Sequence, residues 1–253
     1  LKIMKEITKV YKKLLFSFKN KIDIDKEAND CRSLDELFNY FGTDKGTKVI
    51  NPYLHESNEI LGHGFSKFYE KKLSKFKYDI FKILEIGTWE GSSTAAFTVF
   101  FPNMKIYGLD KNFRFKFKSS RIVFNYCNIN DPKDLDRFSS KHSAEKFKVV
   151  IDDASHILTD MIKSLKFFFK YVEKGGYFII EDFNAPVYFK SLNDSNGREI
   201  LMDKIFKNIN KKKFFKSSIL KKEDQKFLFK NISSIDLFKG KTKISDIAFI
   251  HKK

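Results

Sequence analysis

The chain has 253 residues, of which 42% are apolar, and it carries a formal net charge of +17 at pH 7. This length fits one large α/β domain with an appendage, and the apolar content is sufficient for a hydrophobic core. No run approaches the roughly 18 apolar residues that a membrane-spanning helix needs, and no segment resembles a cleavable signal peptide, so we expect a soluble or peripheral protein.

Lysine supplies nearly all of the positive charge, and the chain has only five arginines. The lysines are scattered, and their densest run is Lys211–Lys213. Arginine makes the bidentate contacts that read bases and phosphates, so its scarcity disfavours a nucleic-acid-binding surface and favours a solvated basic face.

The two cysteines, Cys31 and Cys127, provide neither a disulfide framework nor the spacing of a metal site. We therefore expect reduced thiols and a cytoplasmic location, with membrane-peripheral attachment as the alternative.

Residues 1 to about 30 are predicted to form a basic amphipathic helix, and residues 1–32 form the first predicted segment. Its apolar side chains follow a three-and-four spacing with lysines between them. Such a helix either packs against the protein or a partner, or lies on an anionic membrane. The apolar positions are Ile3, Ile7, Val10, Tyr11, Leu14, Leu15 and Phe18.

Residues 33–78 are predicted to form a helical and loop segment that covers a site. Ser33 and Glu36 give the pattern of a capping box, and the helix that they begin is expected to end near Gly42. The glycine-bracketed loop 42–47 that follows is either a lid or a plain connection. Helical spacing returns between Phe65 and Phe76.

Residues 79–253 alternate strand and helix patterns, which predicts a mostly parallel sheet with helices on both faces. The last two strands, near 232–238 and 244–251, read as an antiparallel hairpin at the edge of a seven-stranded, Rossmann-like sheet. Before them we expect strands near 82–86, 105–109, 121–125, 148–152 and 177–181. The helices are expected near 92–100, 132–140, 158–172 and 198–208.

Two of these strands end in carboxylates. Asp152 and Asp153 follow one apolar run, and Glu181 and Asp182 follow the next, after a predicted turn at Gly175–Gly176. Parallel neighbours place these ends on one edge of the sheet, so the acids and His156 are expected to converge. Carboxylates this close repel one another unless a cation or protons intervene.

A glycine turn and an acid mark the first two strands of this segment. The run from Glu85 through Gly87 to Gly91 enters a helix, so the backbone can approach a ligand closely at the helix N-terminus. The turn lacks the third glycine of the dinucleotide fingerprint, which disfavours NAD. Asp110 ends the next strand, where a carboxylate either binds two ribose hydroxyls or caps a helix.

Together, these motifs resemble the class I S-adenosylmethionine-dependent methyltransferases over roughly residues 80 to 251. A narrower resemblance begins at about residue 33. Over this range the chain resembles the metal-dependent sugar O-methyltransferases of the macrocin and mycinamicin type, and the cephalosporin hydroxylase-like proteins share much of the same pattern. It rests on Thr43-Asp44-Lys45-Gly46, His63-x-Phe65-x-x-Phe68-Tyr69-Glu70, Asp153-x-x-His156 and Glu181-Asp182.

The resemblance implies a role for each matching residue. S-adenosylmethionine would bind Asp110 through its ribose and Asn128 through its adenine. Mg²⁺ or another divalent cation would bind hard carboxylate oxygens and leave positions open for the substrate. His156 would be the general base for a hydroxyl group. The residues at the methionine end of the donor are Glu85, Gly87, Thr88, Gly91 and Ser92, and the metal ligands are Asp153, Glu181 and Asp182.

Several alternatives stay open on the sequence alone. Where relatives carry Gly-Asp-Gln before Asp-Pro, this chain has Cys127-Asn128-Ile129-Asn130, so Ile129 offers adenine only apolar contact. His156 could instead cap the following helix, and the Glu181-Asp182 pair could be solvated. His63 is either a substrate-site residue or a surface histidine, and Asp152 has no assigned role.

We therefore predict a Mg²⁺-assisted O-methyltransferase that acts on a sugar hydroxyl of a polysaccharide precursor or a glycosylated natural product. The alternatives are a methyltransferase for another small-molecule class, such as catechol-like acceptors, and a non-enzymatic nucleic-acid-binding protein on the same scaffold. The expected partner is a small-molecule or glycan acceptor. Peripheral membrane contact through the N-terminal helix and assembly into a homo-oligomer both stay open.

Overall fold

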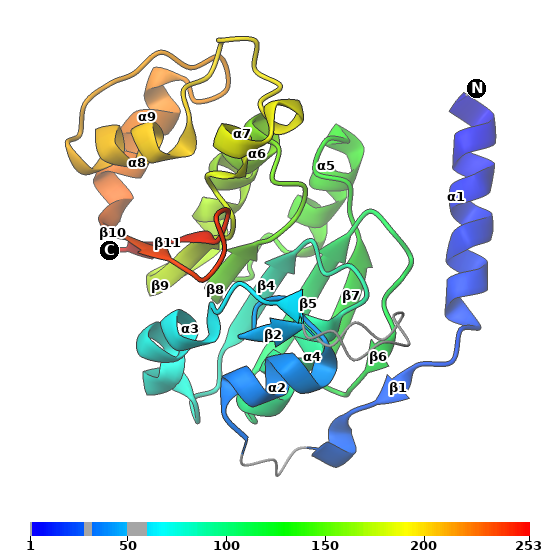
Figure 1. Cartoon of the computed structure of the whole chain (residues 1–253). Coiled ribbons are helices and arrows are strands. Elements are labelled where there is room, and N and C mark those ends of the chain that lie inside the picture. The colour runs from blue at the N-terminus through cyan, green and yellow to red at the C-terminus, as the bar shows by residue number, and fades with distance from the viewer. Residues whose placement is uncertain (1, 28–31, 50–59) are drawn as a thin grey trace.

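The computed structural model describes residues 2–27, 32–49 and 60–253 (Figure 1). Cys31 and part of the predicted covering segment lie outside these ranges.

A seven-stranded sheet forms the centre of the molecule, in the order β10-β11-β9-β8-β4-β5-β7. The five strands from β9 to β7 are parallel, and β11 pairs antiparallel with both β9 and β10. The predicted sheet with its C-terminal hairpin is therefore confirmed. The strands are β4 (Lys82–Ile86), β5 (Lys105–Asp110), β7 (Ile122–Tyr126), β8 (Phe147–Asp152), β9 (Val172–Ile180), β10 (Ile232–Lys239) and β11 (Asp246–Lys252).

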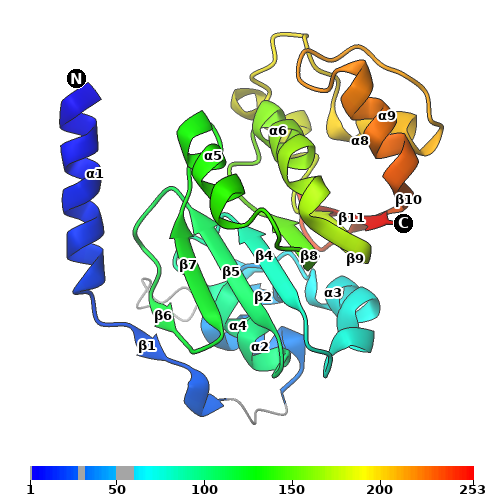
Figure 2. The same cartoon turned by 180° about the vertical axis from the view of Figure 1, so that it is seen from behind.

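Helices cover both faces of this sheet, as predicted (Figure 2). Successive side chains of a strand point to opposite faces, so Leu84 and Ile86 of β4 enter one core cluster and Ile83 enters the other. The first cluster is covered by α5 (Pro132–Lys141), α6 (Leu158–Phe168), α8 (Met202–Asn210) and α9 (Lys222–Asn231); the second is covered by α2 (Leu34–Phe41), α3 (Ser66–Leu73) and α4 (Ser92–Phe100).

The N-terminal helix is shorter than predicted. Helix α1 (Lys2–Ser17) ends about a dozen residues early, because apolar Ile22 and Ile24 then alternate with aspartates at a strand period. Strand β1 (Ile22–Asp23) pairs in parallel with β6 (Phe117–Lys118), and the 3₁₀ helix η1 (Asp25–Glu27) follows. Both views place α1 beside the sheet on its β7 side (Figures 1 and 2).

Strand β9 begins earlier than predicted. After α6 and the 3₁₀ helix η3 (Phe169–Tyr171), the strand runs from Val172, so Gly175 and Gly176 lie within it rather than in a turn. Gly175 has φ +70°, and a Cβ at Gly176 would lie 2.5 Å from the carbonyl oxygen of Lys148. The glycines therefore mark a close approach inside the sheet.

The remaining elements are short. Strands β2 (Lys48–Val49) and β3 (Ile60–Leu61) form a two-stranded ribbon, and α3 continues into η2 (Ser74–Phe76). Helices α7 (Ala185–Tyr188) and η4 (Lys190–Leu192) follow β9. No helix in the described ranges has the length and apolar content to cross a bilayer.

The strand order reverses between β8 and β4, since the chain continues from β4 to β5 on one side and returns to β8 on the other. In open parallel sheets a ligand binds outside the carboxyl ends of the strands at such a reversal. This edge is where the predicted site residues lie.

Candidate functional site

The turn after β4 packs directly on the loop after β8. Gly87 has φ +88°, and a Cβ there would lie 2.1 Å from the carbonyl oxygen of Asp153. Only glycine fits this contact, which joins the predicted donor turn to the predicted metal loop. The two halves of the site are therefore adjacent.

A cavity of about 250 Å³ opens where the parallel strands end. Three predicted donor-binding residues line it, and so does the predicted metal ligand Asp153. Residues at the ends of β4 and β5, and residues that directly follow β7 and β8, thus contribute to one cavity at the reversal of strand order. Its lining includes Gly87, Trp89, Asp110, Asn128, Ile129 and Asp153.

Asp110 is 7% exposed and is held by backbone donors. Its two carboxylate oxygens accept hydrogen bonds from the amides of Trp89 at 2.8 Å and Asn112 at 2.7 Å. A carboxylate has about four acceptor positions, so two remain for ligand hydroxyls. The fixed carboxylate suits the predicted recognition of a ribose.

Asn128 lines the same cavity, but its side chain is already engaged. Its Oδ1 accepts a hydrogen bond from the backbone amide of Asn130 at 3.1 Å, and the backbone amide of Asn128 donates to Asp134 at 3.1 Å. An amide oxygen can accept a second hydrogen bond, so Asn128 retains one acceptor position for an adenine amino group. Ile129 beside it supplies apolar contact.

A second cavity of about 380 Å³ adjoins the first, since Gly87, Trp89, Asp153 and Ala154 line both. Thr88 and Ser92 border this second cavity, opposite Thr43 and Asp44 of loop 42–47. Thr88 Oγ1 is buried and makes no hydrogen bond to any described residue. Unsatisfied buried groups are rare and commonly mark a ligand position.

Glu85 and Gly91 line neither cavity. Glu85 is fully buried, and its carboxylate accepts hydrogen bonds from the hydroxyls of Ser93 and Thr94 in α4. Burial raises the pKa of Glu85 above its ordinary value. Gly91 caps α4 with φ +91°, and a Cβ there would lie 2.5 Å from the ring of Phe115. Both residues shape the turn, and direct contact with a donor stays a prediction.

Asp153 and Glu181 lie close together, and both contact the side chain of Lys45. The Lys45 side chain is 1% exposed, and its Nζ donates to Asp153 Oδ2 and, at 2.7 Å, to Glu181 Oε2. The other oxygen of Glu181 accepts a hydrogen bond from the hydroxyl of Tyr69. Although burial lowers it, the nearby carboxylates of Asp153 and Glu181 raise the pKa of Lys45 well above its ordinary value.

Asp182 lies apart from this pair and faces His63. Its Oδ1 is buried and makes no hydrogen bond within the described chain, although His63 Nδ1 lies 3.2 Å away. Nδ1 of His63 also lies 2.8 Å from Ser245 Oγ. Burial lowers the pKa of His63, but Asp182 and Asp44 outweigh this effect and raise it. The side chain of His63 is 12% exposed, so it is not a surface histidine.

The donor chemistry of these acids fits a hard divalent cation. Asp153, Glu181 and Asp182 offer only oxygen ligands, as such a cation prefers, although Asp182 Oδ1 already lies 3.2 Å from His63 Nδ1. In the described ranges, however, no three histidine, cysteine or carboxylate side chains are arranged to hold a metal ion. Lys45 stands between two of the three predicted ligands.

His156 lies beside Asp153, with Nε2 3.5 Å from Asp153 Oδ1 and a side chain that is 27% exposed. Its backbone has φ +54°, and the same left-handed conformation occurs at Trp89 and Asp182. The three residues follow the carboxyl ends of β8, β4 and β9. Strained backbone of this kind concentrates at functional sites.

Asp152, which had no predicted role, is 3% exposed and lines neither cavity. Its Oδ2 makes no hydrogen bond to a residue that the structure describes. Burial raises the pKa of Asp152 to about 7. Asp152 therefore lies outside both cavities, whereas Asp153 lines both.

The sequence pointed to loop 42–47 but gave Lys45 no role, and it gave Tyr69 none. Lys45 lies 108 residues from Asp153 and 136 from Glu181, and Tyr69 lies 112 from Glu181. The available signal was their place in the motifs Thr43-Asp44-Lys45-Gly46 and His63-x-Phe65-x-x-Phe68-Tyr69-Glu70, which indicate no partner for either residue.

The chain is similar in sequence to two curated enzymes. It is 32% identical over 127 residues to mycinamicin VI 2''-O-methyltransferase of Micromonospora griseorubida, across 47% of this chain and 31% of that enzyme. It is 31% identical over 127 residues to demethylmacrocin O-methyltransferase of Streptomyces fradiae, across 47% and 32%. The chain thus spans about a third of the length of these relatives. No protein-family model matches it.

Among solved structures, the chain resembles the MycE methyltransferase from the mycinamycin biosynthetic pathway in complex with Mg and SAH. The TM-score is 0.64 at 24% identity, and the match covers 87% of this chain and 55% of that one. A second structure of MycE, with Mg, SAH and mycinamycin VI, matches equally well. The chain therefore has the class I methyltransferase fold and is similar in sequence to sugar O-methyltransferases, as its motifs predicted.

Proposed function

We propose that the protein is an S-adenosylmethionine-dependent, Mg²⁺-assisted O-methyltransferase that acts on a sugar hydroxyl of a polysaccharide precursor or glycosylated natural product. The observation that carries this proposal is the position of Asp153. This carboxylate borders both the cavity that contains Asp110 and the cavity beside Thr88 and Ser92, and it lies next to His156. Donor and acceptor groups can therefore meet at one point.

The donor fits the first cavity by its chemistry. The fixed carboxylate of Asp110 accepts the ribose hydroxyls, and Asn128 with Ile129 contacts the adenine. Gly87 lets the backbone approach the methionine end, and Thr88, whose buried hydroxyl makes no hydrogen bond to a described residue, lines the neighbouring cavity. The similar MycE structures contain SAH, the demethylated form of such a donor, which supports this assignment.

Asp153, Glu181 and Asp182 would hold the divalent cation. When bound, Mg²⁺ supplies positive charge that lowers the pKa of a coordinated hydroxyl. His156 takes the hydroxyl proton on its imidazole, and Asp153 orients that ring through Nε2. The freed oxygen bonds to the methyl carbon as the carbon–sulfur bond breaks and its electron pair returns to sulfur. Alignment of oxygen, methyl carbon and sulfur provides much of the rate.

Calorimetric titration with S-adenosylmethionine, with and without Mg²⁺, tests the donor assignment. We expect binding by the wild-type protein and at least tenfold weaker binding by Asp110→Asn, which removes one ribose acceptor. Transfer of labelled methyl to a panel of sugars and phenols then tests the acceptor class. If S-adenosylmethionine does not bind under either condition, the proposal is contradicted. If methyl transfer is as fast in EDTA as in Mg²⁺, the reaction does not need the metal.

We also propose that α1 holds the cytoplasmic protein against an anionic membrane. Four apolar side chains on one face of α1 are exposed, namely Val10, Tyr11, Leu14 and Leu15, and the exposed Phe18 follows directly after the helix. Phe16, by contrast, anchors the helix through ring contacts with Phe113 and Phe124 at 5.5 and 5.2 Å. An uncovered apolar face with lysines around it suits a membrane surface.

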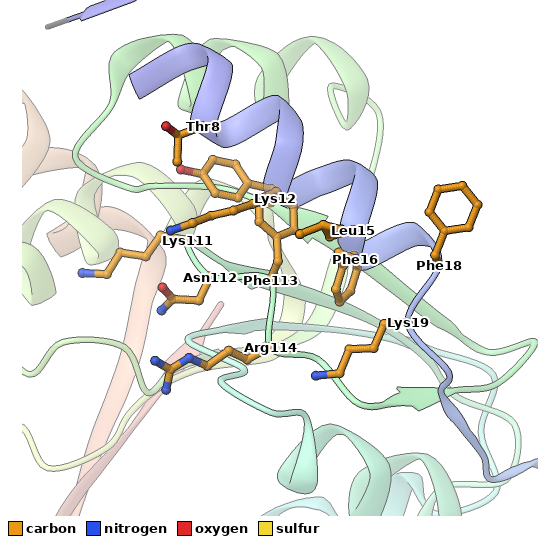
Figure 3. Close-up of a pocket in the computed structure, with 11 residues that line it drawn as sticks. Thr8, Lys12, Leu15, Phe16, Phe18, Lys19, Lys111, Asn112, Phe113 and Arg114 are labelled. Carbon is orange, nitrogen blue, oxygen red and sulfur yellow. The ribbon is translucent and has the colours of Figure 1, made fainter. Parts of the chain in front are cut away.

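The charge around α1 supports an anionic partner. A pocket of about 670 Å³ lies between α1 and residues 111–114 (Figure 3). Its lining contains four cations and no acid from the described residues. Positive side chains next to an exposed apolar face match an acidic lipid surface better than a second copy of this basic chain. The four cations are Lys12, Lys19, Lys111 and Arg114.

A further inference from the structure

Lys45 occupies the space between two carboxylates that are the predicted ligands of a divalent cation. Its ammonium group is buried and contacts an oxygen of Asp153 and an oxygen of Glu181. The lysine comes from loop 42–47, which is separate from the sheet that carries both acids. A positive charge from a different element thus occupies the centre of the acidic site.

The loop that carries Lys45 is firmly held. The Lys45 carbonyl accepts the Phe65 amide at 2.8 Å, and the Gly46 carbonyl accepts the Gly64 amide at 2.8 Å. Asp35 in α2 accepts both the amide and the hydroxyl of Thr47, at 2.8 and 2.6 Å. The position of the ammonium group is therefore built into the fold.

The same loop forms a wall of the second cavity, because Thr43 and Asp44 line it together with Trp89. Thr43 and Asp44 immediately precede Lys45, so the ion pairs of Lys45 with Asp153 and Glu181 tie this wall to the acidic site. The occupancy of the acidic site and the shape of the cavity beside the donor turn are thereby linked.

We propose that Lys45 is a built-in competitor of the divalent cation, so that metal binding displaces its ammonium group from Asp153 and Glu181 and loosens loop 42–47. The inference rests on the proposed function, since it takes these two acids as metal ligands. Both cations need the carboxylates of Asp153 and Glu181, and two positive charges held by the same pair of acids repel each other. Without metal, Lys45 stays paired with both acids and ties loop 42–47 to them.

Calorimetric titration with MgCl₂ alone, without donor or acceptor, tests the competition. We expect Lys45→Met to bind Mg²⁺ at least tenfold more tightly than the wild type, because methionine keeps the length of the side chain and removes its charge. Lys45→Arg retains the charge and should bind no more tightly. Lys72→Met is the matched control, because Lys72 pairs with Asp236 at 2.8 Å outside the site.

Equal or weaker Mg²⁺ binding by Lys45→Met overturns the competition but leaves the metal-dependent function intact. Absence of Mg²⁺ binding by both the wild type and Lys45→Met overturns the metal site and the competition together. The two failures are therefore distinguishable.

Hydrogen exchange of the wild-type protein keeps the test independent of whether Lys45→Met folds. Mg²⁺ should speed exchange at the Thr47 and Phe65 amides at least severalfold, because both are bonded within the Lys45 loop and its anchors. Slower exchange on addition of Mg²⁺ would mean that metal and ammonium coexist, which overturns the proposal. Fluorescence of Trp89, the only tryptophan, provides a second readout of the cavity wall.

Discussion

His156 combines an imidazole beside Asp153 with a left-handed backbone that few residues adopt readily. Asparagine tolerates this conformation, so His156→Asn removes the proposed base without adding backbone strain. We expect methyl transfer to fall by about 10²- to 10⁴-fold, the usual contribution of a general base. Steady-state methyl transfer measures this loss, while calorimetry should give an unchanged Kd for S-adenosylmethionine. If His156→Asn keeps the methyl-transfer rate of the wild type, His156 is not the base, and its role is to cap the following helix.

Acids at the ends of buried strands are unusual, so the sequence could predict Asp110 and Asp153 as site residues, and the structure brings both to one cavity. Glu85 lies within its strand, where the alternation of β4 directs its side chain to the hydroxyls of α4, and its contact with a donor stays a prediction. Lys45 could not be placed, since its partners lie more than a hundred residues away.

Among the elements, α2 orders the Lys45 loop through Asp35. This carboxylate accepts hydrogen bonds from Thr47 and from the Ser66 hydroxyl at 2.6 Å. Burial raises the pKa of Asp35, but these hydrogen bonds outweigh it and lower the pKa below its ordinary value of 3.8. A lowered pKa in the folded state stabilises the protein above the unfolded pKa, and the stabilisation is lost as pH falls through the folded value.

We therefore predict that Asp35→Asn lowers the free energy of unfolding by about 1 kcal/mol at pH 7, a typical net value for a partly exposed hydrogen-bonded group. The difference from the wild type should shrink as pH falls below about 4. Urea unfolding across this pH range measures both effects. Asp79→Asn, at an exposed position, is the control and should change stability little at either pH. A deficit that stays constant down to pH 3 would rule out the Asp35 charge as its cause.

The ends of helices and strands were predictable where burial or a capping residue leaves a clear mark in the sequence. The central strands have continuous apolar runs because both of their faces are buried, and β4 matches its predicted range. The capping box of Ser33 and Glu36 and the left-handed Gly42 likewise delimit α2 as predicted. Helix α9 was missed because its sequence, KEDQKFLFKN, has only one short apolar group and no clear helical period.

For the whole molecule, the alternation of strands and helices predicted the sheet, and the sheet placed the acids at one edge. What the sequence could not supply is how distant segments cover that edge. The position of Lys45 between Asp153 and Glu181 depends on tertiary packing, which the periodicity of one element does not encode, whereas the apolar face of α1 followed from its spacing.

Because the apolar face of α1 is exposed, we predict that the intact protein binds anionic membranes through this helix. The wild type should bind vesicles that contain phosphatidylserine, and this binding should weaken as the salt concentration rises, because lysines supply part of the attraction. Leu14→Glu with Phe18→Glu should lower vesicle binding at least tenfold, since each apolar side chain contributes about 2 kcal/mol on burial. Ile80→Glu is the control, because Ile80 is equally apolar and 90% exposed but lies outside α1. If the double substitution leaves vesicle binding unchanged and instead converts a dimer to a monomer in sedimentation, the face of α1 belongs to an interface between two copies of the chain.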